Sequence, residues 1–349
     1  MLCYNIIFKK LIKRRNKEKF DKVNKFRIFT GITPTGNLTI GHYFSIIKNL
    51  LNLQNNENYE ILIMIADLHA LTIVSDNQID YKKKSKEIAE ILYACGFNEE
   101  KCKIFIQSEI TEHLELSYFL SSYCSIGRLE NMIQYKEKAK KDNSSSFSLL
   151  YYPILMASDI LLYDSDLIIV GKDQKQHLEF AKYIAGKFNK RNPELLKIPD
   201  FFIAKNGSKI MSLHDPSKKM SKSNSDNILI LEDDNKIREK IMKAKTDSEG
   251  KIYFDRIKKP GVSNLLTIYS CLFNCKIDDA EKFFSEKSYS NLKEAIIEKL
   301  INKFSEIRKN IRFSPEEIDK KLLENNKFLK KISSEKLKVI KNKLSLWNL

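Results

Sequence analysis

Residues 30–43 read TGITPTGNLTIGHY, and this stretch decides the fold of the chain. Its glycines allow the backbone to approach a ligand more closely than side chains would permit. Residues 25–30 are expected to form a strand before the turn, and apolar residues recur at helical spacing from 40 to 51 after it. A strand, a glycine-rich turn and a helix are the opening of a nucleotide-binding βαβ unit.

Further strands and helices alternate along the first part of the chain. Residues 59–66, YEILIMIA, are apolar nearly throughout, as in a parallel strand buried on both faces. Residues 103–106 and 167–170 are shorter runs of the same kind, and helical patterns cover 81–95, 113–141 and 176–187. Polar residues follow the strands: Asp67 and His69, Gln107 and Glu109, Gly171 and Gln174. Ligands bind at this carboxyl edge in open α/β sheets, so we predict an α/β domain with a mainly parallel sheet and a site at that edge.

A second feature lies far downstream, where residues 218–223 read KKMSKS. Small polar residues between lysines are typical of a loop that closes over a ligand. Attack of a carboxylate on the α-phosphate of ATP develops negative charge on the transferred group and on pyrophosphate, and mobile ammonium groups stabilise it. Alone, this segment also fits a solvated basic loop, and the glycine turn fits an ordinary strand-to-helix connection. Together they predict adenylate-forming chemistry on ATP.

The pattern changes beyond residue 226, where lysine-rich helical segments follow at 232–245, 264–273, 290–310 and 314–329. The last begins with a serine cap, a first-turn proline and a capping glutamate. We therefore predict three regions, namely a basic extension at 1–25, an α/β domain at 26–225 and an all-helical domain at 226–349.

The composition is that of a globular protein with a basic surface. The 349 residues carry a net charge of +16, with 42% hydrophobic and 30% charged residues. This charge suits a polyanionic partner such as RNA, although an AT-rich genome also produces lysine and asparagine in abundance. The sequence lacks an apolar stretch long enough to span a membrane, so no membrane association is expected. The six scattered cysteines favour reduced thiols and predict no structural metal.

Residues 1–25 read MLCYNIIFKKLIKRRNKEKFDKVNK. A basic segment of this length can be a transit peptide, but this one lacks serine and alanine and contains Glu18 and Asp21. We interpret it as an extension of a cytoplasmic protein. Import into a mitochondrion or another organelle is the alternative.

The glycine turn and the lysine loop together resemble the HIGH and KMSKS signatures of class I aminoacyl-tRNA synthetases. From about residue 26 to at least 266 the chain is similar to the bacterial-type tryptophanyl-tRNA synthetases. The similar segments are DLHALT (67–72), LMASDILLY (155–163), VGKDQKQH (170–177), TDSEG (246–250) and KPG (259–261). The resemblance implies a Rossmann-like parallel-sheet catalytic domain with inserted dimer-forming helices, followed by a C-terminal all-helical domain that binds the tRNA anticodon.

The resemblance implies that L-tryptophan is activated by ATP to tryptophanyl-adenylate and transferred to tRNA(Trp). It also implies a homodimer, formed largely by apolar helices between about residues 113 and 162, and ATP that enters with Mg²⁺. A tyrosyl-tRNA synthetase shares both signatures and is the nearest alternative, and a non-catalytic tRNA-binding paralogue is another. The segment from Met156 to Asp159 favours tryptophan over tyrosine.

The resemblance assigns roles to individual residues. The residues assigned to ATP are Thr33, Pro34, Thr35, Gly41, His42, Gly171, Lys172, Asp173, Ile210, Lys219, Met220, Ser221, Lys222 and Ser223. Those assigned to tryptophan are Gly31, His69, Met156, Asp159 and Gln174. Catalytic roles fall to His42, Lys136, Lys219, Ser221 and Lys222.

Asp159 follows Met156 by one helical turn among apolar neighbours, so both side chains can face one pocket. There the aspartate is expected to accept the indole N–H, with Met156 as a polarisable wall. A buried acceptor that a wrong side chain leaves unpaired costs about 1–3 kcal/mol, which discriminates between substrates. The chain departs from the family pattern at Thr33, commonly glutamine, and at Lys172, commonly glutamate. These departures bear on affinity more than on the reaction itself.

Overall fold

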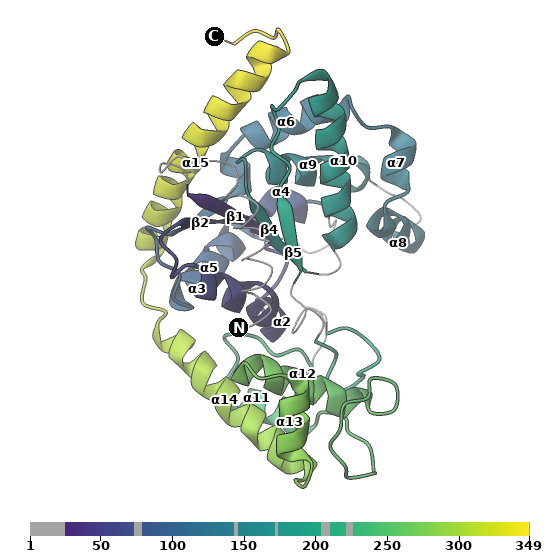
Figure 1. Cartoon of the computed structure of the whole chain (residues 1–349). Helices are drawn as coiled ribbons and strands as arrows, with labels where there is room; N and C mark the ends of the chain where they lie inside the picture. The colour runs from purple at the N-terminus through teal and green to yellow at the C-terminus, as the bar shows by residue number, and fades with distance from the viewer. Residues whose placement is uncertain are drawn as a thin grey trace.

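The computed structural model describes residues 25–72, 79–142, 146–171, 174–203, 210–220 and 226–348. They form an α/β part and a helical part, with a long C-terminal helix running alongside the α/β part (Figure 1). The α/β part contains β1 (Phe26–Ile32), α2 (Ile40–His42), a π-helical turn (Tyr43–Ile47), α3 (Lys48–Leu53), β2 (Tyr59–Ile65), α4 (Asp67–Ala70), α5 (Tyr81–Ala94), β3 (Cys102–Ile106), a 3₁₀ turn (Gln107–Glu109), α6 (Glu112–Ser121), α7 (Ile126–Glu130), α8 (Ile133–Asp142), α9 (Phe147–Leu161), β4 (Leu167–Val170), α10 (Lys175–Arg191) and β5 (Asp200–Ile203). The helical part contains α11 (Asp234–Met242), α12 (Pro260–Phe273), α13 (Ile277–Phe284) and α14 (Tyr289–Lys309), and α15 (Pro315–Lys343) follows.

The sheet is five-stranded and parallel, in the order β3-β2-β1-β4-β5. The central strand β1 pairs with β2 along its whole length and with β4 on its other side, where Ile28 lies opposite Leu167. The chain therefore extends the sheet first to one side of β1 and then to the other. Ligands of open α/β sheets bind at such a switch point, outside the carboxyl ends of the strands. The predicted parallel α/β fold is confirmed.

Both faces of the sheet are covered, which explains the nearly continuous apolar runs of its strands. Along β2, Ile61 and Ile63 belong to a core that includes side chains of α3, α5, α11, α12 and α14. Leu62 and Met64, which point to the opposite face, belong to a core that includes side chains of α6, α9 and α10. The helical part thus shares a continuous core with one face of the sheet.

Helix α15 crosses the edge of the sheet. Near its start, Ile318 and Leu322 join the core on one face, whereas Leu329, Leu337 and Ile340 join the core on the other face. This helix falls within the region predicted to form a separate helical domain, yet it packs on the α/β part.

Two asparagines lie where α15 passes the edge strand β3. Asn325 Nδ2 donates to the carbonyl oxygen of Ile104 at 2.9 Å, and Asn326 Oδ1 accepts the N–H of Ile106 at 2.9 Å. Both asparagines are buried. Unpaired groups on an edge strand invite pairing with other chains, and these side chains occupy them.

Some helices differ from their predicted extents. The single helical pattern expected over 113–141 is wrong, because Ser125 is extended (φ −86°, ψ 148°) and separates α6 from α7. The helix expected over 314–329 continues to Lys343. The elements β5 and α13 were not predicted.

Within the described residues, no helix is long and apolar enough to cross a membrane. Cys95, Cys102, Cys124, Cys271 and Cys275 are free thiols. The basic extension at 1–25 lies outside the described residues except for Lys25.

Candidate active site

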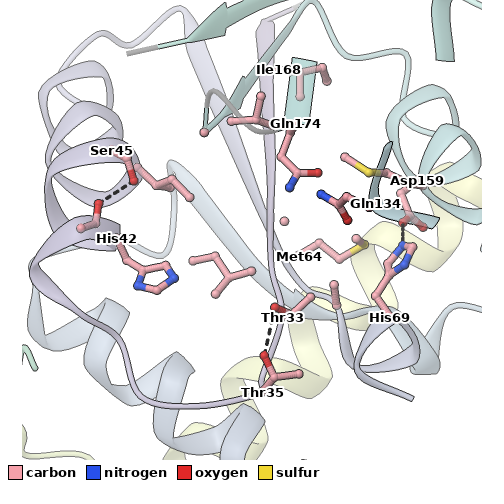
Figure 2. Close-up of a pocket in the computed structure, with 18 of the residues that line it drawn as sticks. Thr33, Thr35, His42, Ser45, Met64, His69, Gln134, Asp159, Ile168 and Gln174 are labelled. Atoms are coloured by element: carbon pink, nitrogen blue, oxygen red, sulfur yellow. Dashed lines mark hydrogen bonds and ion pairs between the residues drawn. The ribbon is translucent and has the colours of Figure 1, made fainter. Parts of the chain in front are cut away.

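A cavity of about 580 Å³ opens at the carboxyl ends of β1, β2 and β4 (Figure 2). The predicted residues that line it are Gly31, Thr33, Thr35, Gly41, His42, His69, Met156, Asp159, Gly171, Gln174, Ile210, Lys219 and Met220. Segments far apart in the sequence therefore meet in one space, at the switch point of the sheet.

Other predicted residues do not line this cavity. Lys136 is exposed on α8, where its Nζ donates to Asn131 Oδ1 at 2.7 Å. Pro34 is buried beside the cavity without lining it. Five predicted residues lie outside the described part of the chain, so their roles stay predictions: Lys172, Asp173, Ser221, Lys222 and Ser223.

The glycine turn brings the backbone close to its neighbours. A Cβ on Gly31 would lie 3.4 Å from Met64 Cε, so β1 and the cavity wall are closely packed here. The ring of His42 is fixed from behind, because its Nδ1 accepts the N–H of Thr39 at 3.1 Å. A neutral His42 ring in this arrangement carries its proton on Nε2. The π-helical turn that follows is a feature often found at functional sites.

Asp159 is 1% exposed on α9, and side chains from several elements surround its carboxylate. His69 Nε2, on α4, lies 2.7 Å from Oδ2. Gln107, which follows β3, donates from Nε2 to Oδ1 at 2.9 Å and to Oδ2 at 3.0 Å. His113 Nδ1, on α6, lies 2.7 Å from Oδ1. Both oxygens are thus held from the ends of β2 and β3 and from α6.

This arrangement keeps the carboxylate ionised. Burial alone would raise the pKa of Asp159, but hydrogen bonds and charge interactions with His113 and His69 outweigh burial and lower it to about 2. Behind His113, the hydroxyl of Tyr163 lies 2.7 Å from Nε2. Burial raises the pKa of Tyr163 well above its usual value, so the phenol keeps the proton that it can donate to His113.

The partners of Asp159 differ in how they face the cavity. His69 lines it, whereas Gln107 and His113 are fully buried and do not. Figure 2 shows His69 and Asp159 at one wall, with Gln134 and Gln174 on the same side and His42 and Ser45 opposite. A ligand group can therefore approach the carboxylate from the side of His69.

Tyr152 and Gln134 also line the cavity and were not predicted. The Tyr152 hydroxyl lies 2.5 Å from His177 Nε2, and its ring packs edge-on against His69. The sequence reasoning also missed the roles of Gln107 and His113. Gln107 had a signal, since it directly follows a predicted strand, but His113 reaches Asp159 only through the packing of α6 on α9.

Lys219 lines the cavity from a short antiparallel turn. Met211 is bridged to Lys219, and Met220 N–H donates to the carbonyl oxygen of Ile210 at 3.0 Å. The preceding Lys218 is instead exposed and pairs with Asp215 at 2.8 Å. Of two adjacent lysines, one therefore lines the cavity and the other lies on the surface.

The described residues contain no group of three or more His, Cys, Asp or Glu side chains that could hold a metal ion. The predicted lack of a structural metal stays a prediction.

Comparisons with known proteins agree with this geometry. Residues 21–305 match the family of class I tRNA synthetases (W and Y). The chain is 42% identical to the tryptophan–tRNA ligase of Malacoplasma penetrans, over 91% of this chain and 98% of that protein. The tryptophanyl-tRNA synthetase of Mycoplasma pneumoniae has a similar structure, with a TM-score of 0.85 and 32% identity over 93% of this chain and 98% of that one. A structure of the Campylobacter jejuni enzyme with ADP and tryptophan matches with a TM-score of 0.75 and 30% identity, over 92% of this chain and 100% of that one. The chain belongs to the class I tRNA synthetases of the tryptophan and tyrosine type, within the family of tryptophan–tRNA ligases.

Proposed function

We propose that this chain activates L-tryptophan with ATP and transfers it to tRNA(Trp). A substrate carboxylate oxygen attacks the α-phosphorus, the bond to the bridging oxygen of pyrophosphate breaks, and tryptophanyl-adenylate forms. A terminal ribose hydroxyl of the tRNA then attacks the activated carbonyl, and AMP leaves. No general base is needed in the first step, because the nucleophile is already ionised.

The observation that carries this proposal is the ionised Asp159 at the wall of a largely apolar cavity. We propose that the indole N–H donates to Oδ2, from the side on which His69 lines the cavity. Because His69 already contacts Oδ2, the indole must share that oxygen or displace His69. Gln107 and His113 hold the carboxylate from behind. A ligand that displaced His69 without supplying an N–H of its own would leave Oδ2 short of that donor, at a cost of about 1–3 kcal/mol or more.

We place the nucleotide at the other end of the cavity, between the glycine turn and Lys219. Thr33, Thr35 and His42 line this end on one side, and Gly171 follows β4 on the other. Lys219 is proposed to stabilise the charge that develops on pyrophosphate, together with Lys222 and Ser221 of the loop beyond it. ATP is proposed to enter as its Mg²⁺ complex, and the remaining roles predicted for Pro34, Lys136, Lys172, Asp173 and Ser223 are retained as proposals.

ATP–pyrophosphate exchange tests the proposal most directly. Exchange should depend on tryptophan and be far weaker with tyrosine at the same concentration. Exchange that prefers tyrosine would favour a tyrosyl-tRNA synthetase. Lack of exchange with either amino acid, in a protein that still binds tRNA, would favour a non-catalytic paralogue.

We further propose a homodimer. Large apolar side chains are exposed on neighbouring helices of the α/β part. These residues are Leu114 and Tyr118 on α6, Ile126 on α7, Ile133 on α8 and Phe147 on α9. Exposed apolar side chains in this number on neighbouring helices mark an interaction surface. Sedimentation should show a dimer, and Tyr118→Glu should shift it toward a monomer. Phe273 is exposed on the helical part and provides a control. If Phe273→Glu shifted the dimer toward a monomer to the same extent, the exposed helices of the α/β part would not be the dimer surface.

The remaining partners follow from the same function. The helical region at 226–349 is proposed to meet the anticodon arm of tRNA(Trp), and the protein is proposed to act in the cytoplasm. A reporter fused to residues 1–25 should stay in the cytosol of eukaryotic cells, and import into an organelle would overturn that location.

A further inference from the structure

Gln107, His113 and Tyr163 form a buried network that supports Asp159. Three side chains of helix α15 hydrogen-bond to residues that directly precede or follow a member of this network in the sequence. The pairs are Asn326 with Ile106, beside Gln107; Ser334 with Glu112, beside His113; and Lys336 with Asp164, beside Tyr163. None of these residues lines the cavity.

The contact at β3 constrains Gln107. The N–H of Ile106 points away from the sheet, and Asn326 Oδ1 accepts it at 2.9 Å. The next residue, Gln107, is fully buried and donates to both oxygens of Asp159. One backbone unit therefore joins the contact of Asn326 to the contact of Gln107 with Asp159.

The other contacts constrain His113 and Tyr163. Ser334 Oγ donates to the buried Glu112 at the start of α6, directly before His113. Lys336 Nζ donates to the carboxylate of Asp164 at 2.7 and 2.8 Å. Asp164 has a φ of 48°, which is uncommon for a residue other than glycine, so its backbone needs support from its surroundings.

We propose that α15 positions the carboxylate that selects tryptophan, with Asn326, Ser334 and Lys336 as positioning residues. The inference rests on the proposed role of Asp159. Since coupling between two equilibria is reciprocal, bound tryptophan must also stabilise the docked state of α15.

Two adjacent asparagines provide a matched test. Asn326→Ala should raise the KM for tryptophan in pyrophosphate exchange by about 2- to 30-fold and lower the preference for tryptophan over tyrosine, with little change in the KM for ATP. Asn325→Ala removes a similar bond to β3, but one that lies further from Gln107, and should leave the amino-acid preference unchanged. Asn326→Asp keeps an acceptor for the Ile106 N–H and should restore the preference.

A second pair tests the far end of the helix. Lys336→Ala should weaken tryptophan selection in the same direction, whereas Lys338→Ala, which removes an exposed lysine of α15, should not. Asp159→Asn, measured in parallel, distinguishes the proposed role of Asp159 in tryptophan selection from the positioning role of α15. If Asp159→Asn loses selection while Asn326→Ala and Lys336→Ala keep it, α15 has no positioning role. If Asp159→Asn keeps selection, the proposed role of Asp159 fails, and this inference with it.

Hydrogen exchange on the unmodified chain covers the case in which Asn326→Ala does not fold. Saturating tryptophan should slow amide exchange in peptides that contain Ile106 and in those of α15, whereas ATP alone should not. Equal exchange in these peptides with and without tryptophan would overturn the coupling.

Discussion

Asp226 Oδ2 accepts the backbone N–H of His214 at 3.0 Å and so ties together the two ends of the segment that carries the lysines. The same carboxylate, 3% exposed, accepts the hydroxyl of Ser212. Burial opposes its ionisation, but these hydrogen bonds prevail and lower the pKa of Asp226. Asp226 therefore holds together the described residues on either side of this stretch.

Replacing Asp226 should impair catalysis more than binding of tryptophan. We expect Asp226→Ala to lower kcat for adenylate formation by about 10- to 100-fold, because charge stabilisation depends on accurate placement of the lysines. The KM for tryptophan should change little. Asp215→Ala is the control, since Asp215 belongs to the same segment but pairs with Lys218 at the surface. Equal kcat values for the two variants would contradict a positioning role of Asp226.

The adjacent lysines should differ in function. Lys219 lines the cavity, whereas the side chain of Lys218 is 76% exposed. Lys219→Ala should reduce kcat for pyrophosphate exchange by about 100-fold, as expected for loss of a group that stabilises charge in the transition state. Lys218→Ala should stay close to the wild-type rate. Single-turnover kinetics of adenylate formation will distinguish them, and similar rates would exclude Lys219 from the chemical step.

Two glycines should respond in opposite directions to the same substitution. A Cβ on Gly261 would lie 1.9 Å from the carbonyl oxygen of Lys245, whose N–H bonds to Leu213 at 2.8 Å. Gly261→Ala should therefore lower the free energy of unfolding by about 1–3 kcal/mol. Gly186, inside α10, has open space at the same position, so Gly186→Ala should raise it by about 0.5–1 kcal/mol. Urea denaturation measures both, and a destabilised Gly186→Ala would refute the packing argument.

The low pKa of Asp159 sets a pH dependence. The pKa of about 2 lies below the ordinary 3.8, so the stabilising contribution of this carboxylate is complete above about pH 5 and is lost as the pH falls through 2. The difference in free energy of unfolding between wild type and Asp159→Asn should shrink from about pH 5 to about pH 3. A difference that grows on acidification would mean that the carboxylate is not held as described.

Local patterns were sufficient to predict a parallel sheet and the edge at which the cavity opens. The apolar runs that became β2 and β3, with the polar residues that follow each, placed His69 and Gln107 at one edge. Each of these inferences depends on neighbours within a few residues. The glycine turn could be assigned for the same reason.

Contacts between distant helices could not be predicted in this way. His113 contacts Asp159 only because α6 packs on α9. The hydrophobic periodicity of each segment does not predict which residues of the two helices come into contact. The length of α15 was underestimated because its polar second half contains few apolar residues, although Leu337 and Ile340 are buried. Lys136 was assigned from a short motif, and that role stays a prediction; in the structure its side chain bonds to Asn131.

The cover that α15 provides for β3 has a consequence for synthesis of the chain. All strands of the sheet precede α15, which follows β3 by roughly 200 residues, or on the order of 10–40 s of translation at about 5–20 residues per second. During that interval the nascent sheet exposes its edge strand, with Ile104 and Ile106 still lacking their asparagine partners. The ribosome-bound chain is thus most open to misassembly, and to capture by chaperones, until its last helix emerges.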